Sequence, residues 1–157
     1  MFHHDARFLI ASHLENQHPP DSPVAGFATF RFEVEPDMED EDEPVAYLYE
    51  LHVSPQSKQK GVGSLLLRGV EAIGSHWSMK KVMLTVLTVN VNAIKFYARL
   101  DYTIDPTSWI ASHPLITTAP RSEAPAEDDE QDPLGPEDRD IDYLILSKIL
   151  PSSTNSA

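Results

Sequence analysis

The sequence contains no cysteine, little positive charge and no long apolar run. The lack of cysteine excludes disulfides, cysteine-based zinc sites and cysteine nucleophiles. Lys and Arg number 12 against 25 Asp and Glu, a formal net charge of −13, which argues against binding along a nucleic-acid backbone and favours a cationic partner. No apolar stretch reaches the roughly 18 residues of a membrane span, and the first residues lack a signal-peptide pattern. We therefore expect no direct nucleic-acid partner, no membrane, and a location in the nucleus and cytoplasm.

The pattern of apolar residues predicts a mixed α/β (α+β) fold in a single domain over residues 1–150. Strands are expected at 7–11, 25–35, 45–53, 81–89, 102–104 and 141–150. Helices are expected from Gly61 to Trp77 and over 90–100, the first with apolar positions Val62, Leu65, Leu66, Val70, Ile73 and Trp77. The acidic run 36–44 is expected to be a loop. Residues 119–139, rich in Pro, Asp and Glu, are expected to be a disordered insertion, and 151–157 a disordered tail.

Two glycines stand at the junction of an expected strand and helix, in Lys58-Gln59-Lys60-Gly61-Val62-Gly63. Without a Cβ, glycine lets the backbone approach a ligand closely. The helix start adds amide N–H groups without intrahelical partners, which suit a pyrophosphate. The dinucleotide fingerprint fails because position 66 is leucine, and the Gly-Lys-Ser/Thr of triphosphate loops is absent. For the glycines alone, an ordinary strand-to-helix turn remains the alternative.

A second segment, Asn90-x-x-Ala93-x-x-Phe96-Tyr97, follows the glycine turn at a spacing that resembles the acetyl-CoA site of the GNAT superfamily. The sequence departs from that pattern at Lys58, where the family has Gln or Arg, and at Asp101-Tyr102, where it tends to have Gly-Phe. The resemblance implies the GNAT fold, a twisted, mostly antiparallel sheet with flanking helices, splayed between the strands at 45–53 and 81–89. It assigns acetyl-CoA, as co-substrate, to Leu51, His52, Val53, Lys58, Gln59, Lys60, Gly61, Val62, Gly63, Ser64 and Asn90.

Four stretches narrow the resemblance to N-alpha-acetyltransferase D (NatD): 28–32, 47–50, 80–86 and 142–147. That family acetylates the N-terminal amine of histone H4-like tails beginning Ser-Gly-Arg-Gly, and a basic tail peptide suits the acidity of this chain. The resemblance makes Tyr47, Tyr49 and Glu50 catalytic or substrate-orienting. It assigns the peptide to Glu33, Glu35, Tyr49, Thr85, Thr107, Ser108 and Tyr143. The helices and aromatic peptide contacts upstream in that family have no counterpart here.

Acetyl transfer requires a neutral amine, and an α-amine with a pKa of about 7.7–8.0 is roughly a tenth to a fifth neutral at pH 7. A carboxylate acting through water then suffices as the base, and we assign Glu50, with a β-bulge turning it and the tyrosines toward the cleft. A backbone amide of Leu51 or His52 would polarise the thioester. Tyr97 is either the acid for the leaving thiolate or core packing. Glu50 and the tyrosines have ordinary alternatives as solvated or sheet-packing residues.

Two other functions stay open from the sequence. The first is a GNAT enzyme that acetylates a small amine, such as a polyamine, or a lysine side chain. The second is a CoA-binding protein without activity, suggested by the absence of the upstream helices. The histidines show no metal-ligand spacing, so we expect no metal, and we expect a monomer.

Overall fold

Six strands form a twisted sheet in the order β1-β2-β3-β4-β6-β5. The computed structural model describes residues 5–12, 23–39, 41–108 and 143–151. Along the chain these form β1 (Arg7–Ser12), β2 (Val24–Pro36), β3 (Asp42–Val53), η2 (Pro55–Ser57), α1 (Val62–His76), β4 (Lys81–Leu87), α2 (Val91–Ala98), β5 (Thr103–Ile104) and β6 (Tyr143–Ile149). This is the expected order of strands and helices. The expected insertion at 119–139 and most of the expected tail lie outside the described residues.

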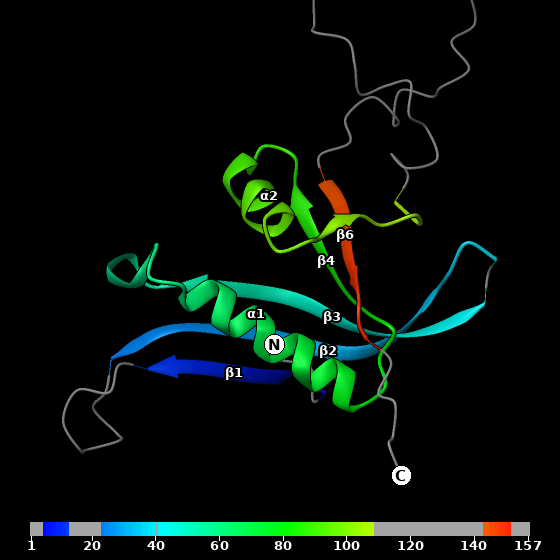
Figure 1. Ribbon diagram of the computed structural model, residues 1–157, viewed down its shortest axis with the longest axis horizontal. Coiled ribbons are helices and arrows are strands. Elements are labelled where there is room, and N and C mark those ends of the chain that lie inside the picture. The colour runs from blue at the N-terminus through cyan, green and yellow to red at the C-terminus, as the bar shows by residue number, and fades with distance from the viewer. Residues whose placement is uncertain (1–4, 13–22, 40, 109–142, 152–157) are drawn as a thin grey trace, which may run out of the picture.

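The sheet opens between β3 and β4, its parallel pair. Val45–Leu48 pair with Lys81–Leu84, and no further pairs of these strands follow among the described residues. Beyond that point β3 continues toward η2 while β4 and β6 turn away toward α2 (Figure 1). The other neighbouring strands pair antiparallel. The mixed, mostly antiparallel sheet and its splay are therefore confirmed, although β4 ends at Leu87, earlier than expected.

A β-bulge lies at the point where the sheet opens. Thr29 pairs with Glu50 but Phe30 pairs with Leu48, so Tyr49 is an extra residue in β3. A bulge of this kind breaks the strict alternation of faces. Leu48 and Leu51 both pack on the core side, which leaves Tyr49 and Glu50 together on the opposite face. The expected bulge is thus present, and it places Leu51 on the core side rather than beside the tyrosines.

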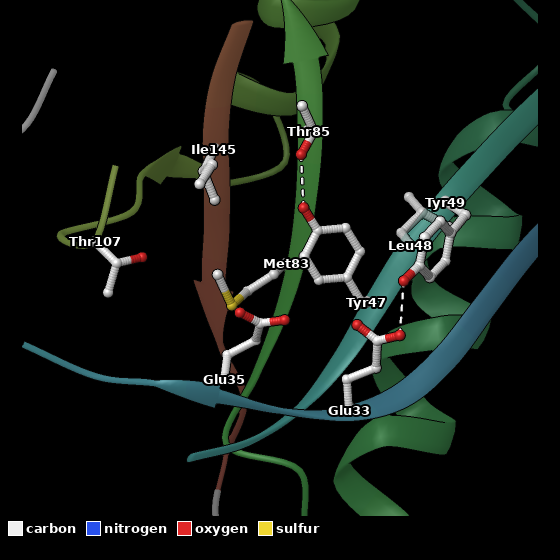
Figure 2. A pocket seen from close by; sticks show the side chains of 9 residues that line it. All are labelled: Glu33, Glu35, Tyr47, Leu48, Tyr49, Met83, Thr85, Thr107 and Ile145. Carbon is white, nitrogen blue, oxygen red and sulfur yellow. Dashed lines mark hydrogen bonds between the residues drawn. The ribbon is translucent and has the colours of Figure 1, made fainter. Parts of the chain in front are cut away.

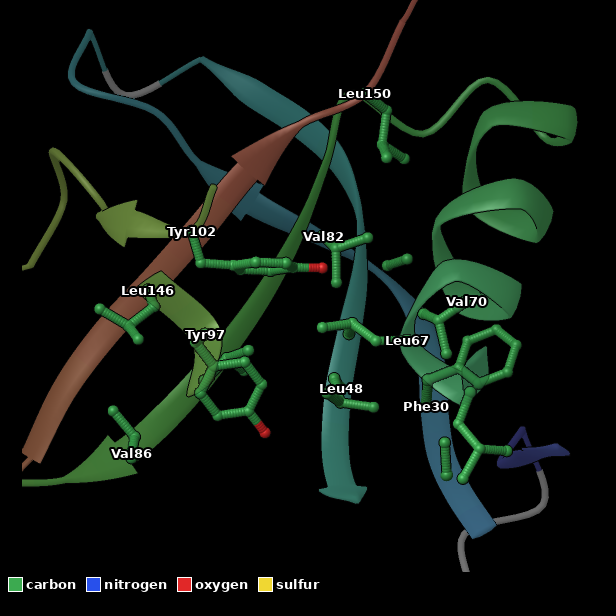
Figure 3. Close-up of a cluster of buried hydrophobic side chains, with 14 residues drawn as sticks. Phe30, Leu48, Leu67, Val70, Val82, Val86, Tyr97, Tyr102, Leu146 and Leu150 are labelled. Atoms are coloured by element: carbon green, nitrogen blue, oxygen red, sulfur yellow. The ribbon is translucent and has the colours of Figure 1, made fainter. Parts of the chain in front are cut away.

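The core lies between α1 and the sheet and continues beneath α2 (Figure 3). α1 buries Leu66, Leu67 and Val70, which follow the helical period. Leu65 and Trp77, expected among the apolar positions, are 65% and 61% exposed. Leu65 lies off the stripe that faces the sheet, and Leu67 takes the core position instead. Of the apolar residues expected in the second helix, Tyr97 belongs to the buried core, and four others are partly buried against it: Ala93, Ile94, Phe96 and Leu100, the last of which lies beyond the end of α2 at Ala98.

The acidic run 36–44 is not wholly a loop, because Pro36 and residues 42–44 are paired strand. β2 and β3 remain in register to Pro36 and Asp42, with Glu35 opposite Glu43. The turn is closed by Asp37, whose N–H donates to the Glu41 carbonyl at 3.0 Å and whose Oδ1 accepts from the Glu39 and Glu41 N–H groups at 2.8 and 3.0 Å. Side-chain capping of this kind suits aspartate, and it lets an acidic sequence end a hairpin.

The helices of the described chain are too short or too polar to cross a membrane.

Candidate functional site

An acidic, tyrosine-lined cavity of about 360 Å³ lies on the face of the sheet opposite α1. Its lining comes from β2, β3, β4, β6 and the segment after β5 (Figure 2). The residues are Glu33, Glu35, Tyr47, Leu48, Tyr49, Met83, Thr85, Thr107 and Ile145. Leu48 and Tyr49 bring the cavity to the place where the pairing of β3 with β4 ends. The cavity therefore adjoins the opening in the sheet.

The hydroxyl groups of the two tyrosines are both held by neighbours. The Tyr47 hydroxyl lies 2.6 Å from Thr85 Oγ1, and Tyr49 donates to Glu33 Oε1 at 2.6 Å. The two rings are 5.2 Å apart between centroids. Burial and the hydrogen bond to Glu33 raise the pKa of Tyr49 to about 12, and burial raises the pKa of Tyr47. Both phenols therefore keep their protons near neutral pH and act as hydrogen-bonding groups, not as bases.

The two glutamates of the cavity differ in their partners. Glu33 accepts from Tyr49 and forms an ion pair with Arg31, whose guanidinium also lies 4.9 Å from the centre of the Tyr49 ring. Glu35 has no ion-pair or hydrogen-bond partner among the described residues. Within the described part of the chain its charge is therefore uncompensated, and its cross-strand neighbour Glu43 is also acidic. A cation entering the cavity would meet Glu35 without displacing a partner from those residues.

The structure gathers six of the expected site residues in this cavity: Glu33, Glu35, Tyr47, Tyr49, Thr85 and Thr107. Three others lie outside its lining. Glu50 is exposed beside the bulge, Ser108 is buried, and Tyr143 is half exposed at the start of β6. The apolar lining residues Met83 and Ile145 were not anticipated from the sequence. The sequence did carry a signal for Met83, because this residue stands two positions before Thr85 in the same strand and so shares its face.

The glycine turn has the conformation that a close backbone approach requires. Gly61 has a φ of 83° and precedes α1 without a side-chain cap, and a Cβ placed there would meet nothing within 4 Å. The first helical bond runs from the Leu65 N–H to the Gly61 carbonyl. The preceding N–H groups, of Val62 to Ser64, therefore point out of the helix end, where an anion binds. Lys58, Gln59 and Lys60 are exposed beside the turn.

Gly63 serves packing. A Cβ at this position would lie 3.3 Å from the Phe96 ring and 3.5 Å from Val53 Cγ2. The glycine thus lets α1 approach both α2 and the end of β3. Of the two glycines in the turn, Gly61 supplies the backbone conformation and Gly63 supplies the space.

The other residues expected at the cofactor flank the opening. Leu51, His52 and Val53 pair with β2 on one side only, so their other edge faces the opening. Asn90 caps α2 by accepting the Ala93 N–H at 3.2 Å. Cofactor contact by these residues stays a prediction. An open strand edge beside a helix start without a side-chain cap fits the extended pantetheine arm and pyrophosphate of acetyl-CoA.

Tyr97 is packed in the core. It is 9% exposed, and its ring lies 5.2 Å from Phe96 and 5.8 Å from Tyr102. Burial raises its pKa to about 12. The environment is that of the packing alternative, and a role as acid stays untested. Among the described residues there is also no cluster of three His, Asp or Glu side chains able to hold a metal ion.

Comparison with known proteins identifies the family. The model of the acetyltransferase (GNAT) family matches residues 1–102, which is most of the chain, so the protein belongs to that family. The resemblance to the GNAT superfamily is confirmed, and the narrower resemblance to NatD stays a prediction.

Solved structures share the fold. The chain resembles a nourseothricin acetyltransferase with a TM-score of 0.58 and 19% identity, over 94% of this chain and 66% of that one. It resembles PaiA N-acetyltransferase of Thermoplasma acidophilum, solved with coenzyme A, with a TM-score of 0.56 and 19% identity over 92% and 61%. It resembles Naa20 of Chaetomium thermophilum, solved with a bisubstrate analogue, with a TM-score of 0.52 and 25% identity over 62% and 50%. The chain thus spans between half and two thirds of these proteins' length.

Proposed function

We propose that this protein is an acetyl-CoA-dependent N-alpha-acetyltransferase of NatD type, acting in nucleus and cytoplasm on tails that begin Ser-Gly-Arg-Gly. The observation that carries the proposal is the cavity itself. It combines two protonated tyrosines, a glutamate with no cationic partner in the described part of the chain, and a position beside the opening between β3 and β4. An amine that enters from this face would meet the reactive end of a cofactor lying in the opening.

The cofactor side of the proposal uses main-chain groups. When bound, acetyl-CoA supplies the acetyl group as a thioester. The amides at the start of α1 would hold its pyrophosphate, with Lys58 and Lys60 beside it. The open edge of Leu51 to Val53 would pair with the pantetheine arm as an added strand. A backbone N–H of Leu51 or His52 would then donate to the carbonyl oxygen that carries developing charge.

The substrate side uses the carboxylates in different roles. Glu35 would bind the arginine of the tail, because its charge has no cation among the described residues. Glu33 would hold Tyr49, since both its partners are already in place. Glu50, on the face of the tyrosines, would take a proton from the α-amine through a water molecule. The bulge at Tyr49 supports this role because it turns both residues to the same face.

The test is incubation of the chain with acetyl-CoA and a Ser-Gly-Arg-Gly peptide, followed by mass spectrometry. We expect acetylation of the free N-terminus and none of an N-terminally blocked copy that contains lysine. Glu35→Gln should raise the peptide KM about tenfold, because it removes the free charge. Glu39→Gln, on the hairpin outside the cavity, is the matched control. Transfer to the blocked peptide alone would refute N-terminal specificity.

A second candidate is acetylation of a small cationic amine. The cavity volume of about 360 Å³ is in the range of small-molecule sites, which favours this alternative. Turnover of spermine without turnover of the peptide would select it. Tight acetyl-CoA binding by calorimetry with no transfer to either amine would instead indicate a CoA-binding protein without activity.

A further inference from the structure

A buried ion pair lies beside the cavity and takes no part in the chemistry proposed above. Asp105 is 0% exposed and Lys81 is 7% exposed. The Lys81 ammonium lies 2.8 Å from Glu43 Oε2 and 3.1 Å from Asp105 Oδ2. Burial alone would lower the pKa of Lys81, but the hydrogen bond to Glu43 and the charge of Asp105 outweigh it and the pKa is raised. Both groups therefore stay charged at neutral pH.

Asp105 directs its other oxygen to Thr107. Its Oδ1 accepts from the Thr107 N–H at 2.9 Å and from the Thr107 hydroxyl at 2.5 Å. The segment is also tied through the main chain, because the Asp105 N–H donates to the Ile145 carbonyl and the Ser108 N–H donates to the Asp105 carbonyl, both at 2.9 Å. Thr107 is thus held by two hydrogen bonds to one buried carboxylate, in a segment that two main-chain bonds fix in place.

Thr107 forms the boundary between two cavities. It lines the tyrosine cavity, and it also lines a neighbouring cavity of about 680 Å³. The larger cavity is bordered by Asp37, Glu39, Glu43, Lys81, Asp105 and Ser147, among others. Figure 2 shows the Thr107 hydroxyl oxygen on the side that faces Ile145 and Met83. The position of one threonine therefore sets how the two spaces meet.

The hydrogen bond also fixes what Thr107 offers to a ligand. A hydroxyl has one hydrogen to donate and two lone pairs. Because the Thr107 hydrogen is committed to Asp105, the hydroxyl oxygen presents only an acceptor to the cavity. Tyr49 is in the same state, since its hydrogen is committed to Glu33. Acceptors of this kind match the N–H groups of a cationic peptide.

We infer that Asp105 and Lys81 are positioning residues. They hold the Thr107 hydroxyl as a hydrogen-bond acceptor in the wall of the tyrosine cavity, where the peptide would bind. The inference rests on the proposed function. A buried ion pair is seldom the most stabilising filling for a core, because an apolar pair of similar volume often serves as well or better. A role in orienting Thr107 gives this pair a reason beyond stability.

The experiment is a double-mutant cycle between Asp105 and Thr107, with the intact chain, acetyl-CoA and the Ser-Gly-Arg-Gly peptide. Asp105→Asn and Thr107→Val are each expected to raise the peptide KM about tenfold, with the acetyl-CoA KM and kcat within about threefold of the unaltered protein. The double variant should resemble the single ones, because both changes act through the same hydroxyl. Thr107→Ser should restore the KM.

The matched control is Lys148→Met. Lys148 also forms a part-buried ion pair, 3.2 Å from Glu71 of α1, and it borders the larger cavity but not the tyrosine cavity. We expect its peptide KM to be unchanged. If Asp105→Asn does not fold, Lys81→Arg replaces it in the cycle. We expect a smaller rise in the peptide KM, which is again not additive with the effect of Thr107→Val.

The inference would be overturned if the rises in peptide KM from the two single substitutions multiplied in the double variant. Equal rises in the peptide KM and the acetyl-CoA KM would also overturn it. Failure of the unaltered protein to acetylate the peptide would refute the proposed function and this inference with it. An active protein in which Asp105→Asn and Lys81→Arg leave the peptide KM unchanged would refute the inference alone.

Discussion

The two halves of β3 have different surroundings, although they belong to one strand. Residues Val45–Leu48 pair with β2 on one edge and β4 on the other, and Val45, Ala46 and Leu48 are buried. From Tyr49 to Val53 the strand pairs, within the described part of the chain, only with β2, and Glu50 and His52 are exposed. The change occurs at the bulge.

The difference shows how one strand serves both stability and binding. The closed half contributes buried side chains and two complete hydrogen-bond ladders. The open half gives up one ladder and exposes polar side chains, which costs stability and leaves backbone groups available to a ligand. Substitutions in the closed half should therefore act on folding, and those around the open half on binding and catalysis.

The largest expected change in the free energy of unfolding comes from a comparison of two leucines, one in each half of β3. Leu48→Ala removes a side chain that is 3% exposed and should lower the free energy of unfolding by about 2–5 kcal/mol. Leu51→Ala, in the open half and only partly buried, should cost about half as much. Urea denaturation measures both. Equal losses would break the comparison between the halves.

The second effect concerns the turn that follows the open half. Gly61→Ala should lower the free energy of unfolding by about 1–2 kcal/mol, because an L-residue resists a φ of 83°. Gly61→Asn should cost less, since asparagine tolerates this region. A steric clash is excluded as the cause, because a Cβ at this position would meet nothing within 4 Å. Thermal denaturation of the two variants measures the remaining cause, which is conformational strain. If Gly61→Ala left the free energy of unfolding unchanged, the left-handed conformation at this position would be contradicted.

The third effect is seen at high pH, in the core on the far side of the opening. The pKa of Tyr97 is about 12 in the folded protein and 10.0 in the unfolded chain. Its contribution to the free energy of unfolding is therefore complete below pH 10 and is lost as pH rises toward 12. At pH 11 the loss from this group should be about 1 kcal/mol. Tyr97→Phe should remove it, while the stability at pH 7 changes by less than about 1 kcal/mol. A Tyr97→Phe variant with the unaltered alkaline stability profile would contradict the assignment.

The smallest change in stability is expected at the bulge itself. Tyr49→Phe should alter the free energy of unfolding by less than about 0.5 kcal/mol, because the side chain is 48% exposed. Loss of its hydrogen bond to Glu33 should nevertheless lower kcat/KM for the peptide about tenfold. Parallel denaturation and kinetic measurements sharpen the division between the halves. A large loss of stability would assign Tyr49 to the structural half.

Sequence periodicity located the strands and helices because it reports burial directly. The near-continuous apolar run at 82–87 and the helical spacing in 90–100 identify β4 and α2 without other information. The glycine turn also carried its own signal, since Gly61 precedes the helix at the position where a left-handed residue is needed.

Features that depend on pairing between distant residues did not follow from the sequence. The extension of β2 and β3 into the two ends of the acidic run depends on their register, which no local pattern gives. Leu65 and Leu67 are alike in the sequence, and only packing against the sheet decides which is buried. Asp105 and Lys81 are 24 positions apart, so nothing near either residue indicated that they meet in the core. The candidate site was anticipated through its tyrosines and glutamates, and its floor and its supporting ion pair came from the fold.

The open edge of β3 also has a consequence for solubility. A strand with one unpaired ladder can template another extended chain, including a second copy of itself, and natural proteins protect such edges with charge, bulges or covering segments. Here the bulge at Tyr49 and the exposed Glu50 interrupt the edge where it begins. A ligand that pairs with Leu51 to Val53 would cover the remainder, so its occupancy would guard the protein against edge-to-edge aggregation as well as supply a reactant.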